Sequence, residues 1–288
     1  MTATGRFERL PSTIRGGVEP AAGRYHLYVS WACPWAHRTI IGRRVMGLEE
    51  AIGMSVVDPI RDERGWAFTG GEHVDDVNGF AYLGEAYAAT DPDYDGRISV
   101  PVLWDKETGR IANNESGDIL RMLATDFAPL AEHPVDLYPE GSRAEIDALE
   151  DEIYAGLNNA VYEAGFATAQ GAYEEAARRV FATLDRLEER LSSRRYLLGA
   201  AITEADWRLF TTLVRFDAVY HHHFKCNLRR LSDYPVLSAY LRDLYGQPGI
   251  AETVRLDDIR AHYYGTHPQI NPHRILPIGP ELDFGVRA

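Results

Sequence analysis

The segment 24–57 constrains the fold more strongly than any other part of the chain, because its hydrophobic pattern changes period twice. Residues 24–30, RYHLYVS, are rich in aromatic and β-branched side chains and predict a strand. From Pro34 apolar residues recur at helical spacing as far as Met46, and residues 51–57, AIGMSVV, predict a second strand. Strand, helix and strand over this short length predict a βαβ unit.

A long connection, residues 59–97, follows this unit. It carries aromatic side chains among many Gly and Asp residues, which favours an ordered, functional segment over a disordered one. Residues 98–116 then predict strand, turn and strand with Thr108-Gly109 at the turn, and a helix is expected over about 117–124.

The remainder of the chain has helical periodicity. After a proline-bearing stretch, residues 143–163, 173–191 and 233–245 each predict a helix, and another begins at Thr203. The sequence therefore predicts an α/β N-terminal domain followed by an all-helical domain. The last residues are too rich in Pro and Gly for regular structure. The expected boundaries are an N-terminal arm at 1–22, the α/β domain at 23–126, the helical domain at 143–260 and an extended C-terminal tail at 261–288.

Composition narrows the possible partners. The chain has 288 residues, 45% of them hydrophobic, which suits a globular protein with a sizeable core. Its formal net charge of −13 argues against nucleic acid or an anionic membrane as the partner, because both select for basic surfaces. No stretch of apolar residues is long enough for a transmembrane helix, and the N-terminal residues lack the apolar segment of a secretory signal. With two cysteines far apart in sequence, a reduced, cytoplasmic protein is expected.

Cys33 lies where the first strand ends and the first helix begins. Pro34 suits the first helical position, which needs no backbone N–H, so Cys33 is the expected N-cap. A sulfur there faces unpaired N–H groups and the positive end of the helix dipole, which favours the nucleophilic thiolate. Ala36 stands where redox motifs often carry a second thiol, so an external thiol, glutathione in a cytoplasm, is expected to resolve a disulfide on Cys33. The alternative is a buried, inert cysteine.

Two dipeptides are candidates for ligand binding. Val100-Pro101 opens a strand; a cis bond there would present the Val100 backbone to a peptide ligand, and the alternative is an ordinary trans proline. Glu115-Ser116 starts a helix, where Ser116 and the first-turn amides can hold a carboxylate. A plain helix cap explains the same residues equally well.

Charged residues give weaker signals. His37 and Arg38 lie on the first helix, where they either support the thiolate, bind carboxylates or form a solvated face. Arg15, Arg61 and Arg64 are further candidates for anion binding.

Metal and disulfide chemistry find little support. The consecutive histidines 221–223 do not predict a metal site, because neighbouring residues on a helix point in different directions. Cys226 is expected to be structural, and a disulfide to Cys33 is not expected.

Taken together, these features resemble the glutathione transferases, which combine a thioredoxin-like N-terminal domain with an all-helical C-terminal domain. ITEADWRLF supports the resemblance, since Thr203 and Asp206 form the capping box with which that family starts a core helix. More specifically, the chain resembles the Xi class, the glutathionyl-hydroquinone reductases, over about residues 5–280. The stretches that carry this resemblance are SWACPWAHRT, LNNAVYEAGFATAQGAYE, LVRFDAVYHHHFKCNLRRLSDYP and PGIAETVRLDDIRAHYYGTHPQINP.

The resemblance implies a reaction and a set of site residues. Cys33 would attack the sulfur of a glutathionyl-hydroquinone, the hydroquinone would leave, and a second glutathione would resolve the Cys33–glutathione disulfide. The residues implied to hold glutathione are Trp66, Val100, Glu115 and Ser116. Those implied to line the aromatic acceptor site are Tyr162, Tyr220 and Tyr263, of which any one is a candidate proton donor.

The resemblance also implies a homodimer that takes glutathione as co-substrate and needs no metal. Two other functions stay open. One is an omega-like thiol transferase that reduces dehydroascorbate or protein–glutathione disulfides. The other is a non-catalytic binding module built on the same fold.

Overall fold

A four-stranded sheet forms the centre of the N-terminal part of the chain in our computed structural model, which describes residues 4–285. The strand order is β2-β1-β3-β4, and β1 (Tyr25–Val29) is parallel to β2 (Gly53–Val56). β3 (Val102–Asp105) pairs antiparallel with β1, and β4 (Arg110–Asn113) pairs antiparallel with β3. Every residue of β1 is buried, as expected for a central strand covered on both faces.

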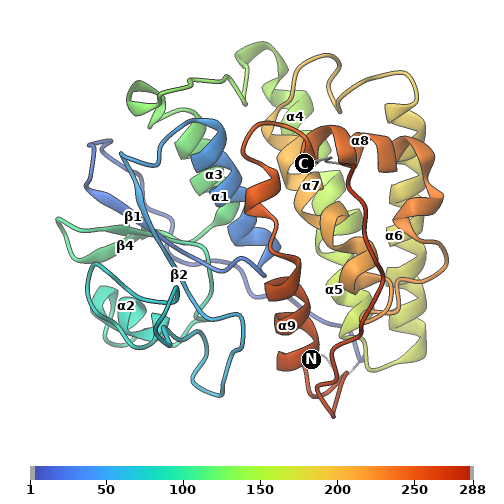
Figure 1. Cartoon of the computed structure of the whole chain (residues 1–288), viewed down its shortest axis with the longest axis horizontal. Helices are drawn as coiled ribbons and strands as arrows, with labels where there is room; N and C mark the ends of the chain where they lie inside the picture. The colour runs from blue at the N-terminus through green and yellow to red at the C-terminus, as the bar shows by residue number, and fades with distance from the viewer. Residues whose placement is uncertain (1–3, 286–288) are drawn as a thin grey trace. The chain divides into compact units, whose positions relative to one another are not determined.

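Three helices pack on this sheet. α1 (Pro34–Val45) and α3 (Ser116–Ala124) lie side by side on one face, and α2 (Leu83–Thr90) lies on the other side (Figure 1). β1, α1 and β2 form the predicted βαβ unit, and the turn between β3 and β4 contains the predicted Gly109 at positive φ. The α/β, thioredoxin-like architecture expected for this domain is therefore confirmed.

The connection 59–97 is less irregular than expected, because α2 lies within it. α2 is only eight residues long, too short to show a helical stripe. Its start is fixed locally instead, by the Glu85 carboxylate, which accepts from the backbone N–H groups of Ala81 and Tyr82 at 2.9 and 2.8 Å.

The rest of this connection is ordered by one buried carboxylate. Asp75 is 4% exposed and accepts a hydrogen bond from the Tyr28 hydroxyl of β1 at 2.9 Å. It also accepts from the backbone N–H groups of Val77, Asn78 and Phe80. A single side chain thus fixes a turn of the connection to the central strand.

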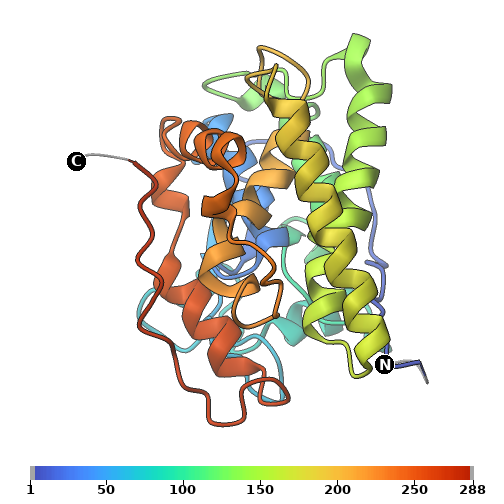
Figure 2. The same ribbon diagram turned by 90° about the vertical axis from the view of Figure 1, so that its right-hand side faces the viewer.

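The C-terminal part is helical, as predicted, and α5 lies alongside α6 (Figure 2). The expected helix 143–163 is interrupted by a π-helical turn over 154–158. Packing against α6 and α7 accounts for this turn: Gly156 lies so close to Thr183 that a Cβ would come within 2.3 Å of its hydroxyl, and the Asn158 amide donates to the Thr212 hydroxyl at 2.7 Å. The helices are α4 (Arg143–Ile153), α5 (Ala160–Gly165), α6 (Gln170–Leu191), α7 (Glu204–Arg215) and α8 (Pro235–Tyr245).

The predicted cap of α7 is present. The Asp206 carboxylate is fully buried and accepts from both the backbone N–H and the hydroxyl of Thr203, at 2.8 and 3.0 Å. It also accepts from the Leu197 N–H and the Tyr240 hydroxyl, so this cap joins three segments of the helical domain. A second π-helical turn, Phe216–Tyr220, follows α7 directly.

The tail begins later than expected. α9 (Leu256–Thr266) continues through residues for which no regular structure was predicted, because the bulky pair Tyr263-Tyr264 is buried and holds the helix in place. The helix ends where Pro268 approaches, since the residue before a proline disfavours helical geometry. Beyond it the chain has turns but no helix or strand within the described residues.

The chain divides into two compact units. The N-terminal unit comprises residues 10–136 and 252–262, and the helical unit comprises residues up to Arg9, 137–251 and those from Tyr263 on. The first residues of the expected arm thus belong to the helical unit. Residues 1–3 of that arm and 286–288 of the tail lie outside the described part of the chain. Within the part described, no helix is long and apolar enough to cross a membrane.

Candidate functional site

Cys33 occupies the predicted N-cap of α1, with Pro34 at the first helical position. Its backbone is extended (φ −80°, ψ 120°), its carbonyl accepts from the His37 N–H at 2.9 Å, and its side chain is partly exposed. The thiol donates to the Val100 carbonyl at 3.8 Å. The Val100-Pro101 bond is cis, so the two features singled out separately in the sequence meet at one place.

Arg61, in the long connection, interacts electrostatically with Cys33. Desolvation lowers the pKa of Arg61, and the electrostatic interaction with Cys33 opposes that shift. The side chain as a whole stays exposed, so the desolvation is partial. The other two arginine candidates are engaged elsewhere: Arg15 forms a two-pronged ion pair with Asp118, and Arg64 pairs with Asp62.

The solvated-face interpretation of His37 and Arg38 is wrong, because both side chains are buried. His37 shares a hydrogen bond of 2.8 Å with the Thr253 hydroxyl, and Arg38 lies over the Trp35 ring at 4.5 Å. Arg38 also donates to the Ser116 hydroxyl at 3.4 Å. The polar character of His37 and Arg38 could not reveal their burial, because that burial depends on segments distant in sequence.

Glu115 and Ser116 lie at the start of α3, where a carboxylate-binding site was considered. Glu115 is the N-cap, and its carboxylate accepts from the Gly117 N–H at 3.2 Å. The Ser116 hydroxyl lies 3.5 Å from the Glu115 carboxylate and is itself almost fully buried. The plain-cap interpretation therefore describes Glu115, while Ser116 lies between a carboxylate and the Arg38 guanidinium.

Trp66 is 4% exposed and packs in the core of the N-terminal unit. Its indole stacks on His262 with centroids 5.0 Å apart, and the Arg61 guanidinium lies 5.1 Å from the ring. His262 in turn shares a hydrogen bond of 2.7 Å with the Pro59 carbonyl. Nothing in the sequence indicated that His262 would lie beside Trp66, because 195 residues separate the two. α9 carries His262 and brings it to the Trp66 ring.

The three predicted tyrosines come together in the helical unit. The hydroxyls of Tyr162 and Tyr263 lie 2.5 Å apart, and those of Tyr220 and Tyr263 lie 3.0 Å apart, so Tyr263 is the middle of a continuous chain. Tyr162 comes from α5, Tyr220 from the π-helical turn after α7, and Tyr263 from α9. Phe224 packs on all three rings at 5.2–5.6 Å.

Burial shapes the acidity of this cluster. It raises the pKa of Tyr220 and of Tyr263 well above the usual value, and the interaction with Tyr162 raises both further. The buried Arg215 opposes these shifts. Tyr162 is 9% exposed, against 0% for Tyr220 and 1% for Tyr263, so it is the end of the chain nearest to solvent.

The remaining cysteine and histidines are structural in character. Cys226 is fully buried, burial raises the pKa of its thiol to about 12, and both cysteines are free. His223 shares a hydrogen bond of 3.1 Å with His267, and His222 shares one with Tyr264. Among residues 4–285 no group of three His, Cys, Asp or Glu is arranged to hold a metal ion.

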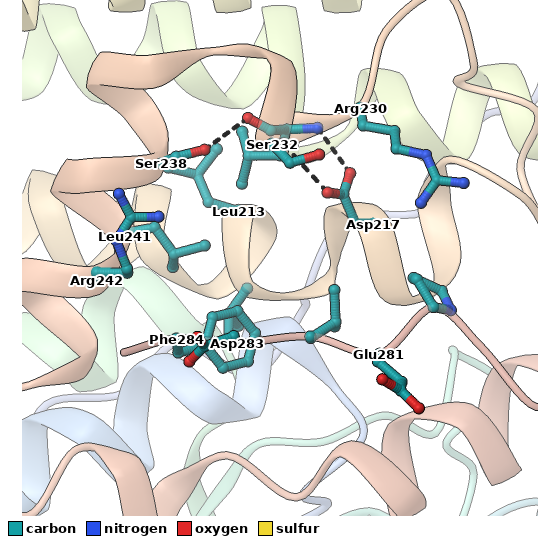
Figure 3. Close-up of a pocket in the computed structure, with 14 residues that line it drawn as sticks. Leu213, Asp217, Arg230, Ser232, Ser238, Leu241, Arg242, Glu281, Asp283 and Phe284 are labelled. Atoms are coloured by element: carbon teal, nitrogen blue, oxygen red, sulfur yellow. Dashed lines mark hydrogen bonds between the residues drawn. The ribbon is translucent and has the colours of Figure 1, made fainter. Parts of the chain in front are cut away.

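A separate cavity of about 140 Å³ lies where the tail crosses the helical unit. Glu281, Asp283 and Phe284 line it from the tail, opposite Asp217 and Arg242 (Figure 3). The Asp217 carboxylate is occupied by the backbone N–H groups of Leu231 and Ser232, so it serves the local fold. None of the predicted site residues lines this cavity.

Known proteins resemble this chain over almost its whole length. Models of the glutathione S-transferase N-terminal and C-terminal domains match residues 32–126 and 170–243. Glutathionyl-hydroquinone reductase PcpF of Sphingobium chlorophenolicum is 51% identical over 282 residues, which cover 96% of this chain and 90% of that protein. The Xi glutathione S-transferase of Phanerochaete chrysosporium has a crystal structure that superposes with a TM-score of 0.93 at 48% identity, covering 96% of this chain and 93% of its own.

A further solved structure is that of glutathione-bound YqjG, a glutathione transferase homolog from Escherichia coli K-12. It superposes with a TM-score of 0.90 at 51% identity and covers 92% of this chain and 87% of its own. Similarity of this extent in both sequence and fold shows that the chain belongs to the glutathione transferases, in the Xi class of glutathionyl-hydroquinone reductases.

Proposed function

We propose that this protein uses glutathione to reduce glutathionyl-hydroquinones to free hydroquinones. The observation that carries the proposal is the place of Cys33, a partly exposed thiol at a helix N-cap, in contact with the backbone of a cis-proline loop. Its sequence neighbour Ala36 offers no second thiol, and Cys226 is buried in the helical unit. Such a cysteine depends on an external thiol to complete a redox cycle.

The reaction has two steps. The Cys33 thiolate first attacks the sulfur of the substrate thioether and forms a disulfide with glutathione. The carbon–sulfur bond breaks, its electron pair passes to the ring carbon, and that carbon takes up a proton. A second glutathione thiolate then attacks the disulfide, releasing oxidised glutathione and the Cys33 thiolate. The ring thereby gains two electrons, and the two glutathione sulfurs lose two as they are oxidised to a disulfide.

The tyrosine cluster supplies the proton in this proposal. Cleavage of a carbon–sulfur bond needs a proton source, whereas exchange between thiols and disulfides delivers no proton to carbon. Three linked hydroxyls, with Tyr162 the least buried of the three residues, suit the first reaction. The cluster therefore favours glutathionyl-hydroquinones over dehydroascorbate or glutathione disulfides as substrate.

Glutathione itself is proposed to bind across the N-terminal unit. The Val100 backbone would pair with its cysteinyl part, and Glu115 and Ser116 would hold the γ-glutamyl group. Trp66 would close the site from the long connection, together with Arg61, whose guanidinium lies 5.1 Å from its ring.

Two measurements test the proposal. Turnover of glutathionyl-menadione and of dehydroascorbate is compared under the same conditions, and we expect the first to be much the better substrate. Mass spectrometry after reaction with glutathionyl-menadione in the absence of free glutathione should show a glutathione adduct on Cys33. A preference for dehydroascorbate would indicate an omega-like transferase, and the absence of any adduct would indicate a binding module.

We further propose that the protein is a homodimer in the cytoplasm. Reduced glutathione and a free Cys33 thiol suit that compartment. The described tail exposes Ile275, Leu276 and Ile278, apolar side chains of the kind that subunit contacts cover. Analytical ultracentrifugation should give the mass of a dimer, and a monomer at micromolar concentration would contradict this.

A further inference from the structure

We infer that Arg9, on the N-terminal arm, is a positioning residue for the acceptor-site tyrosines. Its guanidinium lies over the ring of Tyr162, where it holds the ring and stabilises the phenolate that remains when the hydroxyl gives up its proton. This role rests on the proposed function of the tyrosine cluster. It brings the arm into the chemistry of a site otherwise built from helices.

The arm is docked on the helical unit by contacts on both sides of Arg6. The Gly5 carbonyl accepts from the Thr168 N–H at 3.0 Å. Gly5 has a φ of +71°, and a Cβ there would lie only 2.7 Å from the Cβ of Ala169, so this close approach requires glycine. Two residues on, the ring of Phe7 packs on that of Phe166 with centroids 5.3 Å apart. The backbone leading to Arg9 is therefore fixed.

The Arg9 side chain is held by two aromatic rings and an amide, and one of these rings is that of Phe7, whose centroid lies 5.6 Å from the guanidinium carbon. Its guanidinium carbon lies 4.6 Å from the centroid of the Tyr162 ring, and its Nε donates to the Asn159 Oδ1 at 2.9 Å. The other end of that amide is also engaged, since the Asn159 Nδ2 donates to the Glu163 carboxylate at 2.8 Å, and Glu163 pairs with Arg179. Asn159 is the N-cap of α5 and Tyr162 follows three residues later, so a single cation contacts both.

The position over the ring has a chemical consequence. A cation on the face of an aromatic ring is attracted by its quadrupole and leaves the hydroxyl to make other hydrogen bonds. The Tyr162 hydroxyl keeps its bond to Tyr263, and Tyr162 is the least buried residue of the three. Arg9 thus adds positive charge at the ring of the tyrosine that is proposed to give up its proton.

Other charged and titratable groups also lie around the cluster. Arg215 is buried behind Tyr220 and Tyr263 and favours their ionised forms. The carboxylate of Glu163 is engaged by Arg179 and Asn159. His223 lies against Tyr263 and is bonded to His267; burial, and then the interaction with His267, lower the pKa of His223 to about 3, so it is neutral in the working range.

The first test compares Arg9→Gln, which removes the charge, with Arg9→Lys, which keeps it. We expect Arg9→Gln to lower kcat for glutathionyl-menadione roughly threefold to tenfold at neutral pH and to move the alkaline limb of the rate profile upward by about one pH unit. In Arg9→Lys, the alkaline limb of the rate profile should stay close to its wild-type position. Arg6→Gln is the matched control, because Arg6 is an exposed arginine of the same arm that pairs with Glu175, and it should change neither quantity.

The second test does not depend on turnover. The absorbance of tyrosinate is titrated in the wild type and in Tyr162→Phe, and the difference isolates the ionisation of Tyr162. The same difference is taken between Arg9→Gln and the double variant Arg9→Gln/Tyr162→Phe, and its midpoint should lie about one pH unit higher. Identical midpoints would overturn the role of Arg9, even if the protein reduces glutathionyl-hydroquinones. If the midpoint shifts but the protein does not reduce glutathionyl-hydroquinones, then Arg9 positions Tyr162 as inferred and the proposed function is wrong.

Discussion

The N-terminal unit and the helical unit place their candidate residues by different means. In the N-terminal unit each candidate lies at a place defined by local backbone structure: Cys33 at a helix N-cap, Val100 before a cis proline, Ser116 in the first turn of a helix. In the helical unit Tyr162 and Tyr220 gain their place only through contacts with a third residue from another helix. The candidates of the N-terminal unit can thus be identified one residue at a time, whereas the tyrosines of the helical unit can be identified as a site only once their contacts are known.

The difference also concerns the chemistry. Backbone groups and helix ends recognise a peptide such as glutathione, which has its own amides and carboxylates. Hydroxyl side chains suit a substrate whose only polar groups are ring oxygens. We therefore expect changes in one unit to affect a different step from changes in the other.

The largest effect is expected from Cys33→Ser. Loss of the thiolate removes the nucleophile of the first proposed step, and without the Cys33–glutathione disulfide the second step has no substrate. Turnover of every glutathione-dependent substrate should therefore fall on the order of a thousandfold or more. Cys226→Ala is the matched control, since it removes the buried thiol of the helical unit, and the folded variant should keep its turnover. Steady-state assays of both variants measure this difference in turnover. Substantial turnover by Cys33→Ser would contradict the proposal that the nucleophile lies in the N-terminal unit.

A smaller and more selective effect is expected in the helical unit. Tyr162→Phe and Tyr263→Phe should each lower kcat for glutathionyl-menadione by about a hundredfold, because a positioned general acid contributes on that scale. Exchange between glutathione and a small glutathione disulfide needs no such acid and should change little. Tyr138→Phe, which alters a partly exposed tyrosine bonded to Asp147, serves as control. Equal losses in both assays would mean that the tyrosines act on folding and not on proton transfer.

Ser116→Ala should act on binding in the N-terminal unit. Removing a hydroxyl that lies between Glu115 and Arg38 should raise KM for glutathione by about tenfold and leave kcat nearly unchanged. The discrimination between glutathione and the dipeptide Cys-Gly should shrink, since only glutathione has a γ-glutamyl group. Ser142→Ala, at the start of α4 in the helical unit, is the matched control. If discrimination stays intact, the γ-glutamyl group binds elsewhere.

The smallest expected effect is on stability, and it compares one ion pair from each unit. Arg24 donates twice to the buried Asp105 and holds the pKa of that carboxyl below its usual value. The ionised carboxylate therefore stabilises the folded state above the unfolded-state pKa of about 4, and this stabilisation is lost as pH falls through the folded-state value. Asp105→Asn should lower the urea midpoint at neutral pH, and the difference from wild type should fade in acid.

The matched variant in the helical unit is Asp243→Asn. Asp243 pairs with Arg195, which also lowers its pKa, but the pair is more exposed. Its loss should shift the urea midpoint less, because solvent weakens exposed pairs. A larger shift for Asp243→Asn would contradict the comparison.

Much of the N-terminal fold could be predicted from local sequence. The βαβ unit follows from hydrophobic period, and the N-cap position of Cys33 follows from one proline. Helix α2 could not be predicted, because eight residues carry no periodic signal and its start depends on Glu85 reaching back to the chain before it. The burial of His37 and Arg38 was equally hidden, since polar side chains on a helix ordinarily face water.

In the helical unit the sequence predicted helices but not their irregularities. The π-helical turns precede or contain the cluster tyrosines, and they arise from contacts such as that of Gly156 with Thr183 across two helices. The family resemblance indicated Tyr162, Tyr220 and Tyr263, but not that their hydroxyls are linked in that order around Tyr263. Arg9 lies in an arm without periodic pattern, so nothing in the sequence pointed to it.

By itself the sequence determined where Cys33 lies, because a helix start is a local property and Cys33-Pro34 specifies one with two adjacent residues. Only the tertiary structure decided how the tyrosines are linked and which cation lies over them. Those contacts join residues that are 43 to 153 positions apart. Side-chain packing between distant segments sets such distances, and no period or motif along the chain encodes it.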